Sequence, residues 1–182
     1  MPRVSRQVGV RPRFLRLCDR ISPEPTASAG YASCTVLKRR EPLIQLPSIE
    51  YAEAKRVIDA ITEEISRRGK AGVIAVADPH GELIAFARMD GAPYSSILIA
   101  TNKAYTAARE RKATKEIGEA ARHPEKGFDI AYFGEPRFVG WGGGVPVWKD
   151  SKVIGSVAVS GLPQMEDMEL AKMGVEMISQ GA

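Results

Sequence analysis

The chain contains two pairs of short apolar segments, each pair joined by a tight turn, and few folds accommodate this arrangement. The first pair lies within residues 73–89, with its turn at residues 78–81, and the second lies within residues 145–160, with its turn at residues 150–151. The first turn reads Asp-Pro-His-Gly, which combines a hydrogen-bond acceptor, a fixed φ and a residue that permits positive φ. Strands joined so tightly run antiparallel, so the sequence predicts an antiparallel sheet built from two hairpins.

Helical periodicity surrounds these hairpins. After Ser48, which can cap a helix, apolar residues recur at steps of three and four positions, as on one face of an amphipathic helix. These residues are Ala54, Val57, Ile58, Ile61 and Ile65. A second helix is expected to open at Ser95 or Ser96, a short one to span residues 114–119, and the last one to cover about residues 165–179.

The order of elements is helix, two strands, helix, an irregular connection, two strands and helix. It predicts an α+β fold in which helices pack on an antiparallel sheet. A short strand from Phe138 to Gly140 would bring the sheet to about five strands. In the last strand, the alternation of side chains places Ile154 on the face opposite Val157 and Val159.

Charge divides the chain near residue 40. Residues 1–40 hold nine basic and two acidic side chains, whereas the remaining residues hold 17 basic and 20 acidic ones. The segment 1–40 lacks periodicity and is predicted to be a disordered basic tail, followed by one domain over residues 41–182. The tail could be a transit peptide, a basic arm for an acidic partner, or a segment upstream of the true start.

Composition excludes several classes of protein. The mildly acidic domain offers no electrostatic footprint for nucleic acid, and no run of about 18 apolar residues could span a membrane. Cys18 and Cys34 cannot form a disulfide framework, and no spacing of cysteine and histidine suits structural zinc. Without a recognisable secretory signal, a cytoplasmic location is expected.

Two features are candidates for a binding site. Gly142, Gly143 and Gly144 would let the backbone approach a ligand closely and bind an anion through N–H groups, or they could form a purely structural turn. Lys103 lies at the edge of a small-residue face on the second helix and could reach a pocket, or keep its ammonium in water. Arg109 near the end of that helix could pair with a ligand carboxylate or complement the helix dipole.

Other titratable residues give weaker indications. His80 and His123 are expected to be exposed turn residues, and no metal site is predicted from them. Three pairs of glutamates at i,i+3 spacing could bind a hard or ferric cation weakly, but solvated helix surface explains them better. The pairs are Glu50/Glu53, Glu116/Glu119 and Glu166/Glu169.

Met173 and Met177 are one helical turn apart and are expected to fill the core.

Several motifs together resemble the GlcG/HbpS family of haem-degrading domains, which is related to the C-terminal domain of PduO-type proteins. The matching segments are VIAVADPHG (residues 73–81), RMDGA (88–92), KAYTA (103–107), GGVPV (143–147) and VIGSVAVSG (153–161). The resemblance covers about residues 43–181. It implies a profilin-like antiparallel sheet flanked by helices, and a homo-oligomer between a dimer and an octamer.

The resemblance also implies function. Its members include haem-binding or haem-degrading proteins, and the first hypothesis is a pocket for haem or a related small ligand near Lys103 and residues 142–144. Haem iron requires an axial His, Cys, Met or Tyr, and Tyr105 or a methionine could serve. An alternative is a cofactor-independent lyase, isomerase or hydratase, with Lys103 as acid, base or carboxylate ligand and glycine N–H groups as oxyanion donors. A third is a non-catalytic sensor or accessory module.

Overall fold

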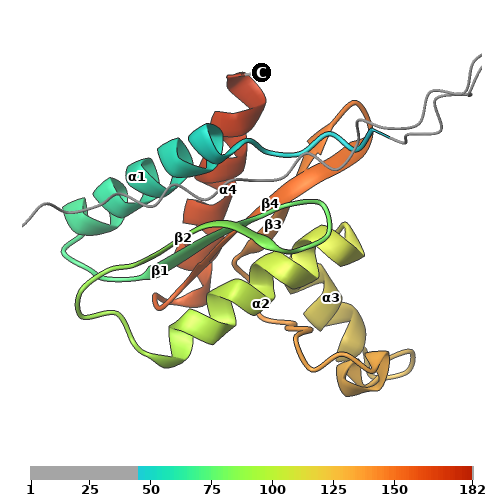
Figure 1. The fold of residues 1–182 in the computed structure, drawn as a ribbon. Helices are drawn as coiled ribbons and strands as arrows, with labels where there is room; N and C mark the ends of the chain where they lie inside the picture. Colours follow the sequence, from blue (N-terminus) through green and yellow to red (C-terminus); the bar gives the residue numbers. More distant parts are fainter. Residues whose placement is uncertain (1–44, 182) are drawn as a thin grey trace, which may run out of the picture. The chain divides into compact units, whose positions relative to one another are not determined.

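The computed structural model describes residues 45–181, so the expected tail over residues 1–40, with both cysteines, lies outside the described residues. Four strands form one antiparallel sheet in the order β2-β1-β4-β3 (Figure 1). Their bounds are Val73–Ala77 (β1), Leu83–Arg88 (β2), Gly144–Lys149 (β3) and Lys152–Ser160 (β4). The two hairpins therefore join edge to edge through the pairing of β1 with β4.

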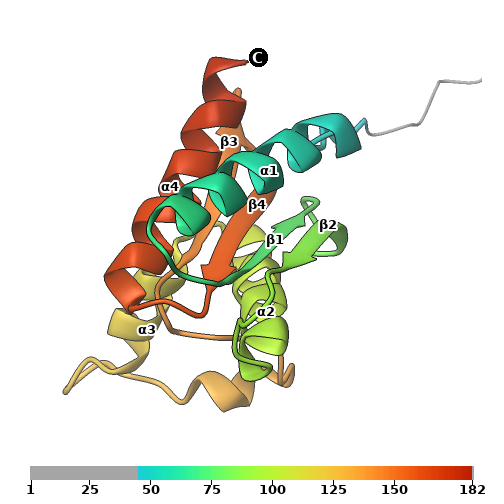
Figure 2. The same ribbon diagram turned by 90° about the vertical axis from the view of Figure 1, so that its left-hand side faces the viewer.

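Helices cover both faces of this sheet. The helices are α1 (Tyr51–Arg67), α2 (Ser95–Glu110), α3 (Thr114–Ala121) and α4 (Gln164–Gln180). α1 and α4 lie together on one face and α2 lies on the other, with α3 beside α2 and β3 (Figure 2). The predicted α+β class is confirmed, with four described strands in place of about five, because Phe138 to Gly140 form no strand. None of the helices described is long and apolar enough to cross a membrane.

β1 is buried on both sides and divides the core into two parts. Ile74 and Val76 pack under α1 and α4. Ala75 packs on the other face against Ala100 and Ala104 of α2. Small side chains on α2 allow its backbone to lie close to the sheet, so a larger residue there would overpack the core at a cost of about 1–3 kcal/mol.

The pairing of β3 with β4 contains a bulge. Val147 pairs with Gly155 and Trp148 with Val153, so Ile154 is the extra residue. Its side chain joins the core under α1 and α4. The prediction that Ile154 faces away from Val157 is therefore wrong, because the bulge interrupts the alternation.

Local sequence determines the two hairpin turns and the N-terminal cap of α1. Asp78 Oδ1 accepts hydrogen bonds from the backbone N–H groups of His80 (2.8 Å) and Glu82 (3.0 Å), as the turn motif predicts. Asp150 and Ser151 both have positive φ, which matches the twist of a two-residue hairpin turn. α1 is capped by Glu50, which forms a capping box with Glu53, instead of by Ser48.

Candidate functional site

A cavity of about 710 Å³ opens between the connection from α2 to α3, strand β3 and the first turns of α4. We call it the large cavity. Its apolar wall consists of Val145, Pro146, Trp148, Met165 and Met168. Met165 is 66% exposed and Trp148 is 48% exposed, so the apolar side chains are accessible to a ligand. A cavity of this size with an apolar wall suits a small organic molecule.

Charged side chains form the rim of the large cavity. The rim consists of Arg111, Lys112, Lys115, Lys172, Glu116 and Glu169. The carboxylate of Glu169 is already paired with the guanidinium of Arg68 at 2.8 Å, and hydrogen bonding to that guanidinium lowers the pKa of Glu169. Lys115 is likewise paired, with Glu119 at 3.7 Å. The remaining cations Arg111, Lys112 and Lys172 outnumber Glu116, so the rim favours an anion.

The three glycines of the turn before β3 are each enclosed by close neighbours. A Cβ at Gly142 would lie 2.6 Å from Sδ of Met168, and one at Gly143 would lie 2.8 Å from Nζ of Lys103. One at Gly144 would lie 2.8 Å from the methyl group of Thr114. The glycines thus let β3 approach α2, α3 and α4, and packing alone explains why they carry no side chain.

Lys103 lies behind this turn, in the interior. Its Nζ donates to Asp167 Oδ2 at 2.8 Å and to the carbonyl oxygen of Val159 at 2.9 Å, and the residue is 2% exposed. Asp167 Oδ1 also accepts from the N–H of Leu162. Burial lowers the pKa of Lys103 and raises the pKa of Asp167, and the charge of each partner opposes these shifts. The pair joins α2, β4 and α4.

Arg109 lies away from the glycine turn, at the first hairpin. Its Nε donates to the carbonyl oxygen of His80 at 2.7 Å, and its guanidinium stacks over the ring of Tyr105 at 4.4 Å. The structure thus brings Lys103 next to Gly143 and Gly144 and leaves Arg109 apart. Of these predicted site residues, only Gly143 and Gly144 are among the described residues that line the large cavity.

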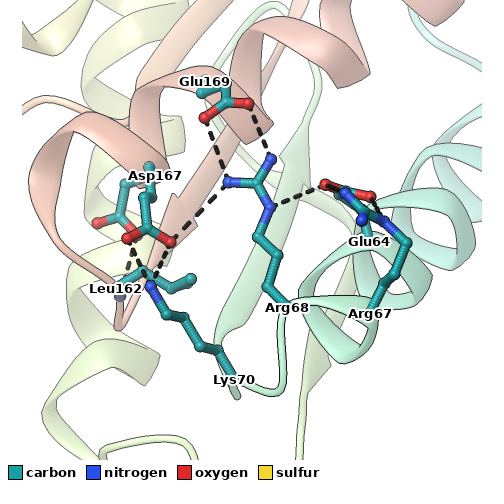
Figure 3. A network of polar contacts seen from close by, with 8 residues as sticks. Glu64, Arg67, Arg68, Lys70, Leu162, Asp167 and Glu169 are labelled. Carbon is teal, nitrogen blue, oxygen red and sulfur yellow. Dashed lines mark hydrogen bonds and ion pairs between the residues drawn. The ribbon is translucent and has the colours of Figure 1, made fainter.

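A polar network connects the end of α1 to the start of α4 (Figure 3). Arg68 donates to Glu64 and Glu169, and Lys70 pairs with Glu166 at 2.6 Å. Hydrogen bonds from Arg67 and Arg68 lower the pKa of Glu64 to about 2.

The three predicted glutamate pairs therefore have different surroundings. Glu166 and Glu169 contact cations of the network, and Glu50 and Glu53 form the helix cap. Glu116 lines the large cavity. Across residues 45–181, no group of three or more His, Cys, Asp or Glu side chains could hold a metal ion.

Side chains from the first turns of α4 contact three different parts of the protein. Met165 and Met168 face the large cavity, Asp167 faces the interior, and Glu166 and Glu169 contact cations from the end of α1. Sequence reasoning missed the two methionines as site residues. Their i,i+3 spacing put them on one helix face, but only the tertiary structure shows that β3 leaves this face open.

Comparison with known proteins identifies relatives over most of this domain. A family model described as haem-degrading protein HbpS-like matches residues 49–176. A 15.0 kDa protein from the dhaT–dhaS intergenic region of Citrobacter freundii is 34% identical over 136 residues, which is 75% of this chain and 96% of the relative. Protein GlcG of Escherichia coli K12 is 37% identical over 107 residues, which is 59% of this chain and 77% of GlcG.

Solved structures share the fold. Protein ORFY of Klebsiella pneumoniae, assigned to DUF336, has a TM-score of 0.71 at 30% identity, covering 77% of this chain and 97% of ORFY. HbpS has a TM-score of 0.68 at 26% identity, covering 79% of this chain and 99% of HbpS. A complex of PduOC with haem has a TM-score of 0.66 at 24% identity, covering 71% of this chain and 94% of PduOC, and shows likeness of fold alone.

Proposed function

The chain belongs to the HbpS-like family of haem-degrading proteins, and from this membership we propose that it binds haem, or a ligand of similar shape and charge, in the large cavity. The observation that carries the proposal is the pairing of an apolar wall with a cationic rim in one cavity. A porphyrin is a flat apolar ring with carboxylate side chains, so it matches both parts.

The side chains of the wall fit the requirements of haem iron. The iron takes an axial His, Cys, Met or Tyr, and Met165 and Met168 supply two thioethers to the large cavity. Tyr105 is engaged elsewhere, because its hydroxyl group donates to Glu135 at 3.2 Å. Neither His80 nor His123 is among the described residues that line this cavity. When bound, haem supplies an iron centre for one-electron and oxygen chemistry.

The cationic rim would orient such a ligand. Lys112 lies just before α3, Lys115 lies in the first turn of α3 and Lys172 lies in α4, so positive charge reaches the cavity from two sides. Ammonium groups are strong donors to carboxylates, and they would hold the propionates at the rim while the ring contacts the wall.

The alternative of a cofactor-independent enzyme receives less support from the geometry. The N–H of Gly144 already donates to Oγ1 of Thr114 at 3.0 Å, so it is engaged within the fold. The ammonium of Lys103 is engaged by Asp167 and Val159. Both groups would have to give up these bonds to act as oxyanion donor or general acid, so ligand binding is the function that the site supports best.

Titration of the full-length chain with hemin tests the proposal. We expect a saturable shift of the Soret band, and a weaker or altered shift in the double variant Met165→Leu/Met168→Leu, which preserves volume and removes both sulfur atoms. Met177→Leu on the same helix is the matched control, since Met177 is not among the described residues that line this cavity. Absence of saturable binding by the unmodified protein would overturn the proposal.

We also propose that the chain self-associates, as the family resemblance implies. Large apolar side chains are exposed on α2 and on the neighbouring edge strand β2. They include Tyr94, just before α2, Leu98 within α2, and Leu83 and Phe86 within β2. Tyr94 contacts β2 through Arg88, whose guanidinium lies 5.0 Å from the ring centroid. Exposed apolar side chains in this number support an interface with a second copy.

A further inference from the structure

A second cavity, of about 320 Å³, shares two wall residues with the large cavity. Arg111 and Trp148 line both. The second cavity also holds His80 from the first hairpin turn and Lys152 at the start of β4. We call it the cationic cavity, because the charged residues among its described lining are the cations Arg111 and Lys152. The two cavities therefore adjoin, and the remaining wall of the second consists mainly of apolar residues, namely Leu46, Pro47, Pro79 and Val153.

The residue between the cavities has an unusual backbone conformation. Arg111 follows the last residue of α2 with φ 55° and ψ 33°, in the left-handed region where glycine is usually found. Within residues 45–181, the other non-glycine residues with positive φ are Asp150 and Ser151, which form a hairpin turn that requires it. At Arg111 the same conformation ends α2, and it fixes the backbone from which the guanidinium projects.

The guanidinium of Arg111 is available for a ligand. In the described part of the chain it forms no hydrogen bond or ion pair, whereas Arg68, Arg109 and Arg137 all do. Arginine presents five N–H donors in a planar fork that suits carboxylate and phosphate groups.

The elements around the cationic cavity are held in place by the fold. The hairpin turn that carries His80 is tied to α2 by the hydrogen bond from Arg109 to the carbonyl oxygen of His80. The carboxylate of Asp78 lies 3.7 Å from Nδ1 of His80, and it is engaged by backbone N–H groups of its own turn. These contacts thus hold the turn that brings His80 to this cavity.

We propose that the cationic cavity is an anion subsite of the same ligand site, in which Arg111 binds a carboxylate or phosphate group of a ligand whose apolar part lies in the large cavity. The identity of that apolar part rests on the proposed function, whereas the subsite for the anion rests on Arg111, His80 and Lys152. The ligand is accordingly an amphipathic anion, with haem and its two propionates as one instance.

Titration of the full-length protein with phenyl phosphate and phenylacetate, followed by amide and indole NMR signals, tests the subsite directly. The variant Arg111→Gly removes the cation and at the same time supplies the residue that favours this backbone conformation, so we expect an unchanged or higher melting temperature. We expect its affinity for the better of the two probes to fall about tenfold, as for loss of a charged hydrogen bond. The probe that binds more tightly identifies phosphate or carboxylate as the preferred group.

Lys126→Gly is the control, because Lys126 is an exposed lysine that is not among the described residues lining either cavity. We expect Lys126→Gly to change the affinity for these probes less than about twofold. Equal binding of the probes by Arg111→Gly and the unmodified protein would overturn the proposal, and so would an equal loss in Lys126→Gly.

A porphyrin experiment separates this inference from the proposed function. The unmodified protein is expected to bind protoporphyrin IX more tightly than its dimethyl ester, and Arg111→Gly is expected to show a smaller preference, because the lysines of the large cavity remain. A preference that is unchanged in Arg111→Gly would contradict the subsite and leave porphyrin binding intact. Failure of both porphyrins and hemin to bind, with phenyl phosphate or phenylacetate still dependent on Arg111, would contradict the proposed function and leave the subsite intact.

Discussion

The ammonium of Lys103 lies 2.8 Å from a carboxylate oxygen of Asp167, and both residues are at most 3% exposed. Removing one partner of a buried ion pair leaves an uncompensated charge. We therefore expect Lys103→Met to lower the free energy of unfolding by about 3–5 kcal/mol in urea denaturation. The double variant Lys103→Met/Asp167→Leu should regain most of this loss, because it leaves no unpaired charge. Unchanged stability of Lys103→Met would contradict a structural role for the pair.

The polar network between α1 and α4 predicts a pH dependence of stability. The pKa of Glu64 is lowered to about 2 by hydrogen bonds from Arg67 and Arg68. A lowered carboxyl pKa stabilises the fold above the unfolded pKa, and this contribution is lost as the pH falls from about 4.5 toward 2. We expect the stability of the unmodified protein to approach that of Glu64→Gln over this range in chemical denaturation. Glu64→Gln should itself lose less stability than the unmodified protein over the same range, and equal losses would contradict this role of Glu64.

Alanine is expected to destabilise the protein more at Gly143, in the glycine turn, than at Gly134, which has no close neighbours. Gly143 has φ +117°, and a Cβ there would lie 2.7 Å from the carbonyl oxygen of Val159 as well as close to Lys103. Gly134 has φ +72° with nothing within 4 Å of such an atom. We expect Gly134→Ala to cost about 1–2 kcal/mol from backbone strain alone, and Gly143→Ala to cost distinctly more, in thermal unfolding. Equal losses would indicate that the neighbours of Gly143 can move away.

A charge among the exposed apolar residues of α2 and β2 is expected to weaken self-association. Leu98 is 64% exposed on α2, so a charge there should leave the monomer folded and weaken an apolar interface. We expect Leu98→Glu to lower the mass measured by light scattering at a given concentration. Tyr51→Glu, at a 65% exposed position on α1, is the control and should keep the mass unchanged. A monomeric unmodified protein at all concentrations would refute self-association.

Much of the fold was predictable because it depends on local chemistry. The Asp-Pro-His-Gly turn is held by Asp78 as the motif predicts, and the apolar stripe of α1 is buried position for position. The bulge at Ile154 was not predictable from alternation, since it depends on how β3 pairs with β4. Capping by Glu50 also depends on a reciprocal contact with Glu53 that competes with Ser48.

The candidate site was less predictable, because it is assembled from distant segments. Spacing on α2 placed Lys103 at the edge of a small-residue face, but its partner Asp167 is 64 positions later in the chain. Met165, Met168 and Arg111 had no distinctive motif, and they meet only because β3 lies between α3 and α4. A long-range partner cannot be read from the periodicity of a single helix.

The short linker before α4 has a consequence for variation in chain length. One residue inserted or deleted between Gly161 and Gln164 would rotate the start of α4 by about 100° relative to its present setting. Successive side chains there face the large cavity, the interior and the end of α1. Such an insertion or deletion would therefore disrupt all three sets of contacts together. In longer or shorter variants of this protein, the spacing from β4 to α4 should therefore stay fixed.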